Sequence, residues 1–429
     1  MSKKSLRTKE IEQKKTSIES KRLQRILKNF LISEKNMYFL VKEGQTEAYV
    51  SEDNDPDIPT ASASVFYNPE MELNRDLNVA VTSVFVKKLM ARKKFDLSQI
   101  TYLDAFSASG IRGLRVAKEV GISAVLNDWK EEAATLIQKN IDHNGLGETV
   151  LVSCQNANKL LHSQKFAIVD IDPFGSPSQF LDAAVSSASF MLGVTATDTA
   201  PLCGAHLKSG MRKYSAVPLN NEFHSEMGLR ILIGSMVREA AKFDKGVKPL
   251  FSHATRHYVR VYAEILNGAG NADKSLKELG FVSWCPKCGC FETKNGLAVY
   301  MNEFCPECST PTEKQSRKIS GPLWLGTFKE ADFCDAVLLE LETSALNKKE
   351  EAFKLLTVCR NEADLPFFYD QHLLCEKLKI SASPMEPFLE KLRARGYTAT
   401  RTHFSGTSFK TDAPMTEILE TLKTISGRN

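Results

Sequence analysis

Residues 170–177 (DIDPFGSP) place an acid, a proline and an aromatic ring directly after a short apolar run. This combination suits methyl transfer to an exocyclic amine on a planar base, because the lone pair of such an amine is delocalised into the ring. Asp172 can accept one amino hydrogen while a backbone carbonyl accepts the other, which directs the lone pair at an electrophilic methyl group. Phe174 can hold the base by stacking. We predict that Asp172, Pro173 and Phe174 form a catalytic corner; a turn that only closes a strand is the alternative.

A second segment, residues 104–113 (DAFSASGIRG), joins a predicted strand to a helix through small side chains. Small residues let a ligand approach the backbone at a helix N-terminus. The segment lacks the GxGxxG pattern, which disfavours a pyrophosphate cradle. Asp128 stands at the predicted carboxyl end of the next strand, where an acid can accept both hydroxyls of a ribose. Capping of the following helix is a second role for Asp128, compatible with the first.

Ten cysteines are too few for a disulfide scaffold, and four of them form two CxxC pairs, Cys285/Cys288 and Cys305/Cys308. Four thiolates in this spacing predict a tetrahedral structural zinc site, with no coordination position left for water. Free buried thiols are the alternative, and Cys290 is placed to compete for a ligand position.

The chain of 429 residues is 42% hydrophobic and 25% charged, which predicts two to four domains of ordinary soluble composition. No apolar run approaches the 18 or so residues that span a bilayer, so we expect no membrane association. Residues 1–38 form a basic extension, with eleven Lys or Arg against four Glu in the first 35 positions. It suits a solvated extension, a nuclear address or an RNA-contacting arm. We expect an intracellular protein, in the nucleus, the cytoplasm or both, with a mitochondrial location left open.

Short apolar runs alternate with helical patterns after residue 100, which predicts a doubly wound α/β fold. The predicted strands are 101–105, 123–127, 149–152, 166–171 and 192–196, and the helices are 111–119, 130–143 and 178–189, with Asp128 as a helix cap. A helix at 222–242 then precedes two strands, 248–253 and 258–265, too close together for a crossover helix. An antiparallel hairpin at the sheet edge favours a Rossmann-like methyltransferase sheet over a dinucleotide-binding one.

The last part of the chain predicts a C-terminal α+β domain. Residues 281–310 hold the zinc module, and residues 365–415 resemble a winged helix, with a helix at 369–378 and a wing at 397–410. Ser383 as N-cap, Pro384 and Glu386 predict the start of the second helix, and Gly396 its end. A solvated surface and a nucleic-acid surface both fit the basic face of this segment, which comprises Lys391, Arg393, Arg395, Arg401, His403 and Lys410.

Taken together, these motifs resemble the family of tRNA guanine-26 N2-dimethyltransferases. The resemblance covers most of the chain. It rests on residues 42–44, 66–76, 104–113, 170–177, 197–204 (TDTAPLCG), 321–326 (GPLWLG) and 395–414. It implies a methyltransferase domain at 39–270 and a tRNA-binding domain at 271–429. It also implies S-adenosylmethionine as the methyl donor for two sequential transfers to the N2 atom of guanine 26, with Asp172 as the orienting acid.

The resemblance also implies the residues that hold the donor. Arg75 and Arg112 would line its methionine end, and Asp128 would take the ribose. The family usually carries an Asp where this chain has Asn156, so we expect a weaker contact with the adenine amino group. The implied cofactor-binding set is Arg75, Asp104, Ser109, Gly110, Arg112, Asp128, Asn156 and Ala157.

Two rival functions remain at this point. One is methylation of a DNA adenine or a protein amide, although Gly175 follows a single Pro-Phe pair in place of the usual Pro-Pro-aromatic form. The other is a noncatalytic nucleic-acid-binding protein built from the zinc and winged-helix modules. Acids at successive strand ends count against it. We expect tRNA as the partner and a monomer as the oligomeric state.

Overall fold

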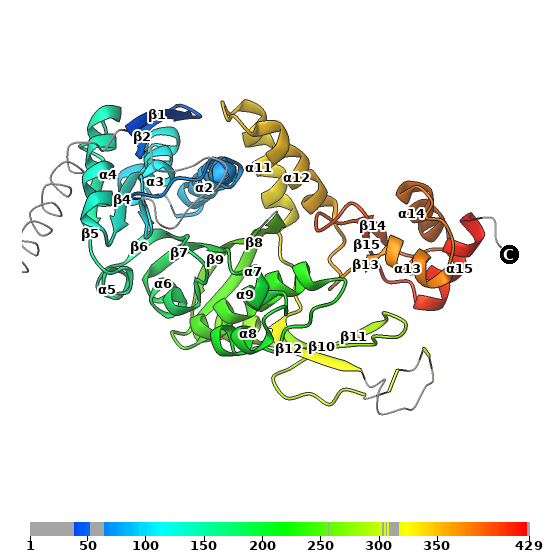
Figure 1. Cartoon of the computed structure of the whole chain (residues 1–429). Coiled ribbons are helices and arrows are strands. Elements are labelled where there is room, and N and C mark those ends of the chain that lie inside the picture. Colours follow the sequence, from blue (N-terminus) through cyan, green and yellow to red (C-terminus); the bar gives the residue numbers. More distant parts are fainter. Residues whose placement is uncertain are drawn as a thin grey trace, which may run out of the picture.

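The computed structural model describes residues 38–51, 64–93, 95–255, 257–302, 304–305, 307–308 and 317–426 (Figure 1). The basic extension predicted for residues 1–38 therefore lies outside the described residues, except for Tyr38. Within the described ranges, no helix is both long and apolar enough to cross a membrane.

A seven-stranded sheet forms the centre of the protein, in the order β5-β4-β3-β6-β7-β9-β8. Its first five strands are parallel, whereas β9 pairs antiparallel with both β7 and β8. The strands are β3 (Thr101–Asp104), β4 (Ser123–Asp128), β5 (Val150–Cys154), β6 (Phe166–Ile171), β7 (Ala188–Ala196), β8 (Lys245–Thr255) and β9 (Tyr258–Asn267). The parallel strands and the antiparallel edge hairpin confirm the predicted methyltransferase-like sheet.

Helices cover both faces of this sheet, as its apolar strands require. One core contains side chains of α5 (Ala157–Ser163), α6 (Leu181–Ser187) and α9 (His224–Ala241). The core of the opposite face draws on α2 (Glu72–Lys93), α3 (Ile111–Arg115), α4 (Glu131–Asn144), α11 (Ala331–Thr343) and α12 (Lys349–Asn361). Residues far apart in the sequence thus share one core, and Figure 1 shows α11 and α12 beside α2.

Several predicted boundaries differ from the structure. The helix expected at 111–119 is α3 followed by a π-helical turn, η3 (Val116–Val120), and the helix expected at 178–189 is a 3-10 turn, η4 (Ser178–Phe180), followed by α6. β7 begins at Ala188, four residues before its predicted start. The prediction that Asp128 caps a helix is wrong, because Lys130 is the N-cap of α4 and Asp128 still belongs to β4.

The remaining elements flank the sheet or extend from it. They are β1 (Tyr38–Glu43), β2 (Thr46–Ser51), η1 (Pro69–Met71), η2 (Leu97–Gln99), α7 (Thr199–Leu202), α8 (Leu207–Tyr214), α10 (Ala269–Lys277), β10 (Leu279–Trp284), β11 (Phe291–Asn295), β12 (Lys318–Trp324), β13 (Tyr369–Asp370), α13 (Gln371–Leu378), α14 (Met385–Ala394), β14 (Ala399–Arg401), β15 (Ser408–Thr411) and α15 (Met415–Ile425).

The C-terminal elements form the predicted helix-turn-helix with a wing, in which α13 and α14 accompany a sheet of order β13-β15-β14. The capping prediction for α14 is wrong. Pro384 occupies the N-cap position, and the Ser383 hydroxyl and carbonyl oxygens accept hydrogen bonds from Gln371 Nε2 instead. Gly396 follows the helix in a left-handed conformation, as predicted.

The predicted basic face of this segment is largely neutralised. Arg393 and Arg401 pair with Glu386, and Arg395 pairs with Glu417 and Glu420. His403 and Lys410 belong to no surface, because both side chains are fully buried against acids. Of the six residues predicted to form this face, only Lys391 lacks an ion pair with a described residue.

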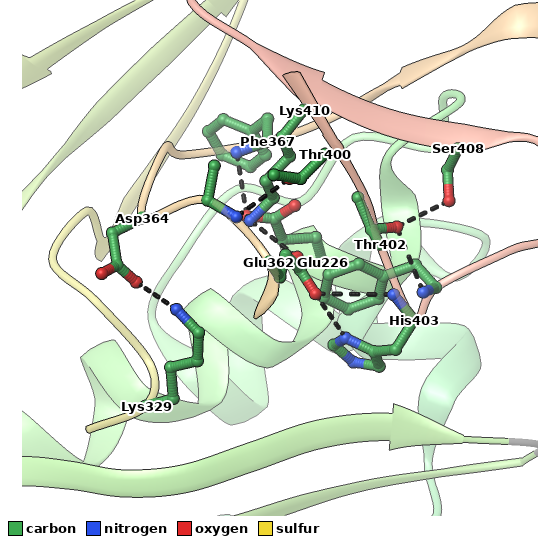
Figure 2. Close-up of polar contacts among 12 residues, drawn as sticks. Glu226, Lys329, Glu362, Asp364, Phe367, Thr400, Thr402, His403, Ser408 and Lys410 are labelled. Atoms are coloured by element: carbon green, nitrogen blue, oxygen red, sulfur yellow. Dashed lines mark hydrogen bonds and ion pairs between the residues drawn. The ribbon is translucent and has the colours of Figure 1, made fainter. Parts of the chain in front are cut away.

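A buried charge cluster of Glu226, Glu362, His403 and Lys410 joins the winged segment to α9 (Figure 2). The Lys410 ammonium lies 3.0 Å from Glu226 Oε1 and 2.9 Å from Glu362 Oε1, and His403 Nδ1 lies 2.8 Å from Glu362 Oε2. Burial alone would raise the pKa of Glu362, but Lys410 and His403 lower it to about 2. The cluster is therefore a charged contact between the central domain and the C-terminal elements.

Candidate active site at the carboxyl ends of the parallel strands

A cavity of about 390 Å³ opens where β3, β4 and β6 end. Carboxyl ends of parallel strands meet at one edge, so acids that follow successive strands come together there. The cavity is lined by eight of the predicted site residues: Arg75, Asp104, Ser109, Arg112, Asp128, Asp172, Pro173 and Phe174. Three predicted residues, Gly110, Asn156 and Ala157, are not among its lining residues.

Gly110 shapes the cavity wall without lining it. It is the N-cap of α3 with φ +83°, a left-handed conformation that favours glycine. Gly113, one turn later, has no room for a side chain, because a Cβ there would lie 2.7 Å from the Leu126 side chain. The glycines of the segment therefore serve the tight packing of α3 on β4.

Asn156 and Ala157 lie at the start of α5. Asn156 is exposed, and its side-chain oxygen accepts the backbone N–H of Lys159 at 3.2 Å, which makes it the helix N-cap. Ala157 is buried in the core on that face of the sheet. The contact expected between Asn156 and an adenine amino group stays a prediction.

Asp172 is held by Arg112, which forms an ion pair with its carboxylate. The same guanidinium donates to Asn74 Oδ1 at 2.8 Å, so that its orientation is determined from two sides. Burial works against the charged form of Arg112, but Asp172 and Asp170 raise its pKa overall. Arg112 was predicted to line the methionine end of the donor; the structure places it at the predicted catalytic acid.

Asp170, two residues earlier, lies inside the sheet and pairs with Arg260 of β9. Arg260 also donates to Thr195 Oγ1 at 2.9 Å and to Asn78 Oδ1 at 3.0 Å. Burial would raise the pKa of Asp170, but Arg260 and Arg112 lower it. This buried pair supports the strand end from which Asp172 projects.

Asp104 is the least satisfied acid of the cavity. Its Oδ1 accepts a long hydrogen bond of 3.4 Å from the Phe106 N–H, and its Oδ2 has no hydrogen-bond partner among the described residues. Burial raises its pKa to about 7, with Arg112 opposing the shift and Asp170 and Asp172 adding to it. A buried oxygen without a partner in a cavity is a ready acceptor for a cationic ligand group.

Asp128 is positioned by two backbone donors. Its Oδ2 accepts the Ala108 N–H and its Oδ1 accepts the Lys130 N–H, each at 3.0 Å. Each carboxylate oxygen keeps a further lone pair, so both can still accept a hydroxyl. This geometry suits the ribose contact that the sequence predicts.

Arg75 reaches the cavity from α2 and is held by Glu43 of β1, with its Nε 2.7 Å from Glu43 Oε2. Its Nη2 also donates to the Asn68 carbonyl at 3.0 Å, and Tyr67 donates its hydroxyl to Glu43 Oε1 at 2.9 Å. The guanidinium therefore fixes residues 67–68 along the cavity.

Aromatic rings form the mouth of the cavity. Phe66 and Phe174 pack edge to face with centroids 4.4 Å apart, while Phe174 remains 61% exposed and Trp129 73% exposed. Phe66, Trp129 and Thr197 line the cavity but were not among the predicted site residues. A signal was available for all three, because Phe66 and Thr197 each open one of the family-like segments and Trp129 directly follows Asp128.

The four predicted zinc ligands also come together. The sulfur atoms of Cys285, Cys288, Cys305 and Cys308 all lie within 4.8 Å of one another, and two of the pairs are 3.6 Å apart. Zinc bound to four thiolates at about 2.3 Å requires sulfur separations of about 3.8 Å, so the arrangement fits the metal. Cys290 lies outside this group of four, with its Sγ 3.1 Å from that of Cys305 and an Arg317 N–H directed at it.

Comparisons with known proteins identify the family of the chain. A family model described as N2,N2-dimethylguanosine tRNA methyltransferase matches residues 44–423. The chain is 57% identical over 373 residues to a tRNA (guanine(26)-N(2))-dimethyltransferase of Methanosarcina mazei, covering 87% of this chain and 95% of the relative. It is 43% identical over 389 residues to the enzyme of the same description from Haloarcula marismortui, covering 89% and 98%.

A solved structure leads to the same family. The complex of Trm1 from Pyrococcus horikoshii with S-adenosyl-L-methionine superposes with a TM-score of 0.77 at 37% sequence identity, covering 90% of this chain and 99% of that one. The resemblance found in the sequence is thereby confirmed, and this chain belongs to the N2,N2-dimethylguanosine tRNA methyltransferase family.

Proposed function

We propose that this protein transfers two methyl groups in succession from S-adenosylmethionine to the N2 atom of guanine 26 in tRNA, with Asp172 orienting the amino group. The observation that carries the proposal is that Asp172 and Phe174 line the same cavity as Asp104 and Asp128. An acid for the amine, a ring for the base and two acids for a donor thus share one site.

S-adenosylmethionine supplies an electrophilic methyl group when it is bound. The unpartnered Asp104 Oδ2 suits its cationic methionine end, and the two oxygens of Asp128 suit its ribose hydroxyls. Gly113 lets α3 pack closely against β3 and β4, because a side chain at this position would collide with Leu126.

Asp172 is proposed to accept a hydrogen bond from the guanine amino group, so that the nitrogen lone pair points into the cavity. Arg112 holds the carboxylate in place, and Phe174, supported by Phe66, stacks on the base. Catalysis then comes from orientation and electrostatics, with no covalent intermediate. Methyl transfer leaves the nitrogen as a cationic, acidic ammonium group. Asp172 or water therefore suffices as the base that removes its proton.

The four-thiol group of Cys285, Cys288, Cys305 and Cys308 is proposed to hold one structural zinc ion that supports a tRNA-binding C-terminal part. Four sulfur ligands leave no open position on the metal, so it takes no part in methyl transfer.

The deciding experiment incubates the protein with an unmodified tRNA transcript and labelled donor, followed by nucleoside analysis. We expect monomethylated guanosine first and dimethylated guanosine later. Asp172→Asn should lower kcat by about two to three orders of magnitude, because the lost contact acts on the reacting amine.

Asp182→Asn, at a half-exposed acid on α6 that does not line the cavity, is the matched control and should leave kcat unchanged. Methylated adenosine as the product, or full activity of Asp172→Asn, would contradict the proposal.

A further inference from the structure

Helix α8 carries positive charge that no acid of the described ranges neutralises. The stretch from Thr199 to Asn221 contains no Asp or Glu, whereas α8 carries Lys208, Arg212 and Lys213. Lys208 and Arg212 are four positions apart and therefore share one face of the helix, with Cβ atoms about 6 Å apart. Both side chains are exposed, and neither pairs with an acid of the described ranges.

The C-terminal elements offer less free charge than their sequence suggests. Arg393, Arg395 and Arg401 all pair with glutamates, and Lys410 is fully buried. A cation with an acid beside it attracts phosphate more weakly, because the two fields partly cancel. These four residues therefore contribute less free charge to phosphate binding than their sequence suggests, and cations without an acidic partner contribute more.

Tyr214, the last residue of α8, ties the helix to the rim of the cavity. Its hydroxyl donates to Asp198 Oδ1 at 2.6 Å and lies 2.9 Å from the Ser176 hydroxyl, which donates to it. Asp198 directly follows Thr197, which lines the cavity, and Ser176 is two residues from Phe174 at its mouth. Two residues of chain span at most about 7 Å, so the C-terminal end of α8 lies close to the mouth of the cavity.

The two rim segments are also joined to each other, so that they hold α8 as one unit. The Gly175 N–H donates to Thr197 Oγ1 at 2.8 Å, and the Thr197 N–H donates to the Gly175 carbonyl at 3.0 Å. Lys213 adds an ion pair to Asp198 at 3.1 Å. Lys213 is therefore engaged in positioning α8, which leaves Lys208 and Arg212 free for a ligand.

We propose that Lys208 and Arg212 on α8 bind backbone phosphates of the RNA strand next to the target nucleotide. This inference rests on the proposed function, since it takes tRNA as the substrate. Two exposed cations one helical turn apart, in a stretch without acids, suit adjacent phosphates and carry no base specificity. Their anchoring to residues 174–176 and 197–198 couples the grip on the backbone to the position of the base.

The test compares the double variant Lys208→Gln/Arg212→Gln with the intact chain. The dissociation constant for an unmodified tRNA transcript is measured between 50 and 300 mM KCl. Loss of two phosphate contacts should reduce the slope of log K against log salt by about 1.4 to 1.8, and weaken binding about tenfold or more at 100 mM. KM for tRNA should rise accordingly, while the dissociation constant for S-adenosylmethionine should not change.

Lys118→Gln/Lys165→Gln is the matched control, since it removes the same charge from exposed positions in η3 and directly before β6, at the amino ends of the parallel strands. Its salt slope should equal that of the intact chain. The exchange variant Lys208→Arg/Arg212→Lys keeps both charges and should restore the slope.

An unchanged slope in the α8 double variant, or no tRNA binding by the intact chain, would overturn the inference. If the intact chain methylates guanine N2 and the α8 variant binds tRNA normally, only the α8 surface is wrong. If the α8 variant loses salt-dependent binding but the intact chain makes no methylated guanosine, the surface stands and the proposed function is wrong.

Discussion

Asp104 shows how one side chain can link ligand binding to pH. Its pKa is raised to about 7, so the carboxyl group is largely protonated at pH 6 and largely ionised at pH 7.5. The ionised form is the one that attracts the cationic end of the proposed donor. Donor binding below pH 7 must therefore displace a proton.

We predict that the affinity for S-adenosylmethionine rises about eightfold between pH 6 and pH 7.5, because the ionised fraction of Asp104 rises by that factor. Calorimetric titrations across this range measure it. Asp104→Asn should bind more weakly and lose this part of the pH dependence; an unaltered pH profile in the variant would assign the titration to another group.

The proposed zinc module lies at the ends of the paired strands β10 and β11. Cys285 directly follows β10, and Cys288 lies three residues before β11, so the metal would close the turn between two paired strands. Structural zinc contributes about 10 kcal/mol or more to modules of this kind.

We predict that Cys305→Ser, or treatment with a chelator, unfolds this module and leaves the seven-stranded sheet intact. Metal analysis should find one zinc per chain before treatment and none after it, and limited proteolysis should then cut near the cysteines. Cys154→Ser, at an exposed cysteine of β5, should retain zinc. Absence of zinc from the untreated protein would contradict the prediction.

The backbone of strand β7 packs directly against the buried Asp170–Arg260 ion pair. A Cβ at Gly193 would lie 2.7 Å from both Arg260 Nη2 and Asp170 Oδ2. We predict that Gly193→Ala lowers the free energy of unfolding by about 1 to 3 kcal/mol, because the pair must shift. Urea denaturation measures the change, and Gly406→Ala, where a Cβ meets nothing within 4 Å, should have little effect.

At the scale of the whole molecule, the buried charge cluster connects α9 to the winged segment. Lys410 lies between Glu226 and Glu362 with all three side chains fully buried. We predict that Lys410→Met lowers the free energy of unfolding by about 3 to 5 kcal/mol, because two buried carboxylates lose their shared cation. Thermal denaturation provides the measurement. Arg395→Met, at a more exposed ion pair, should cost less than about 1 kcal/mol.

The cluster also makes the free energy of unfolding depend on pH. The folded-state pKa of Glu362, about 2, lies below the ordinary value of 4.5, so its contribution is present above pH 4.5 and is lost as the pH falls toward 2. Removal of the carboxyl group in Glu362→Gln should flatten this part of the stability profile. An equally steep loss in the variant would show that other acids are responsible.

Much of the fold and of the site follows from local patterns. The parallel strands β3 to β6 appear as short apolar runs, the two CxxC pairs predict the thiol group, and the acids Asp104, Asp128 and Asp172 come at strand ends. Each of these signals lies within a few residues, because burial, turns and metal ligation impose requirements on neighbouring positions.

Which charges meet depends on the three-dimensional path of the chain. Arg112 reaches Asp172 across 60 positions, and Lys410 reaches Glu226 across 184. A basic residue that becomes buried has the same local sequence pattern as one that stays on the surface. For this reason the sequence predicts Lys410 as part of an exposed basic face. The partner that neutralises a charge depends on the path of the chain through space, which no local spacing encodes.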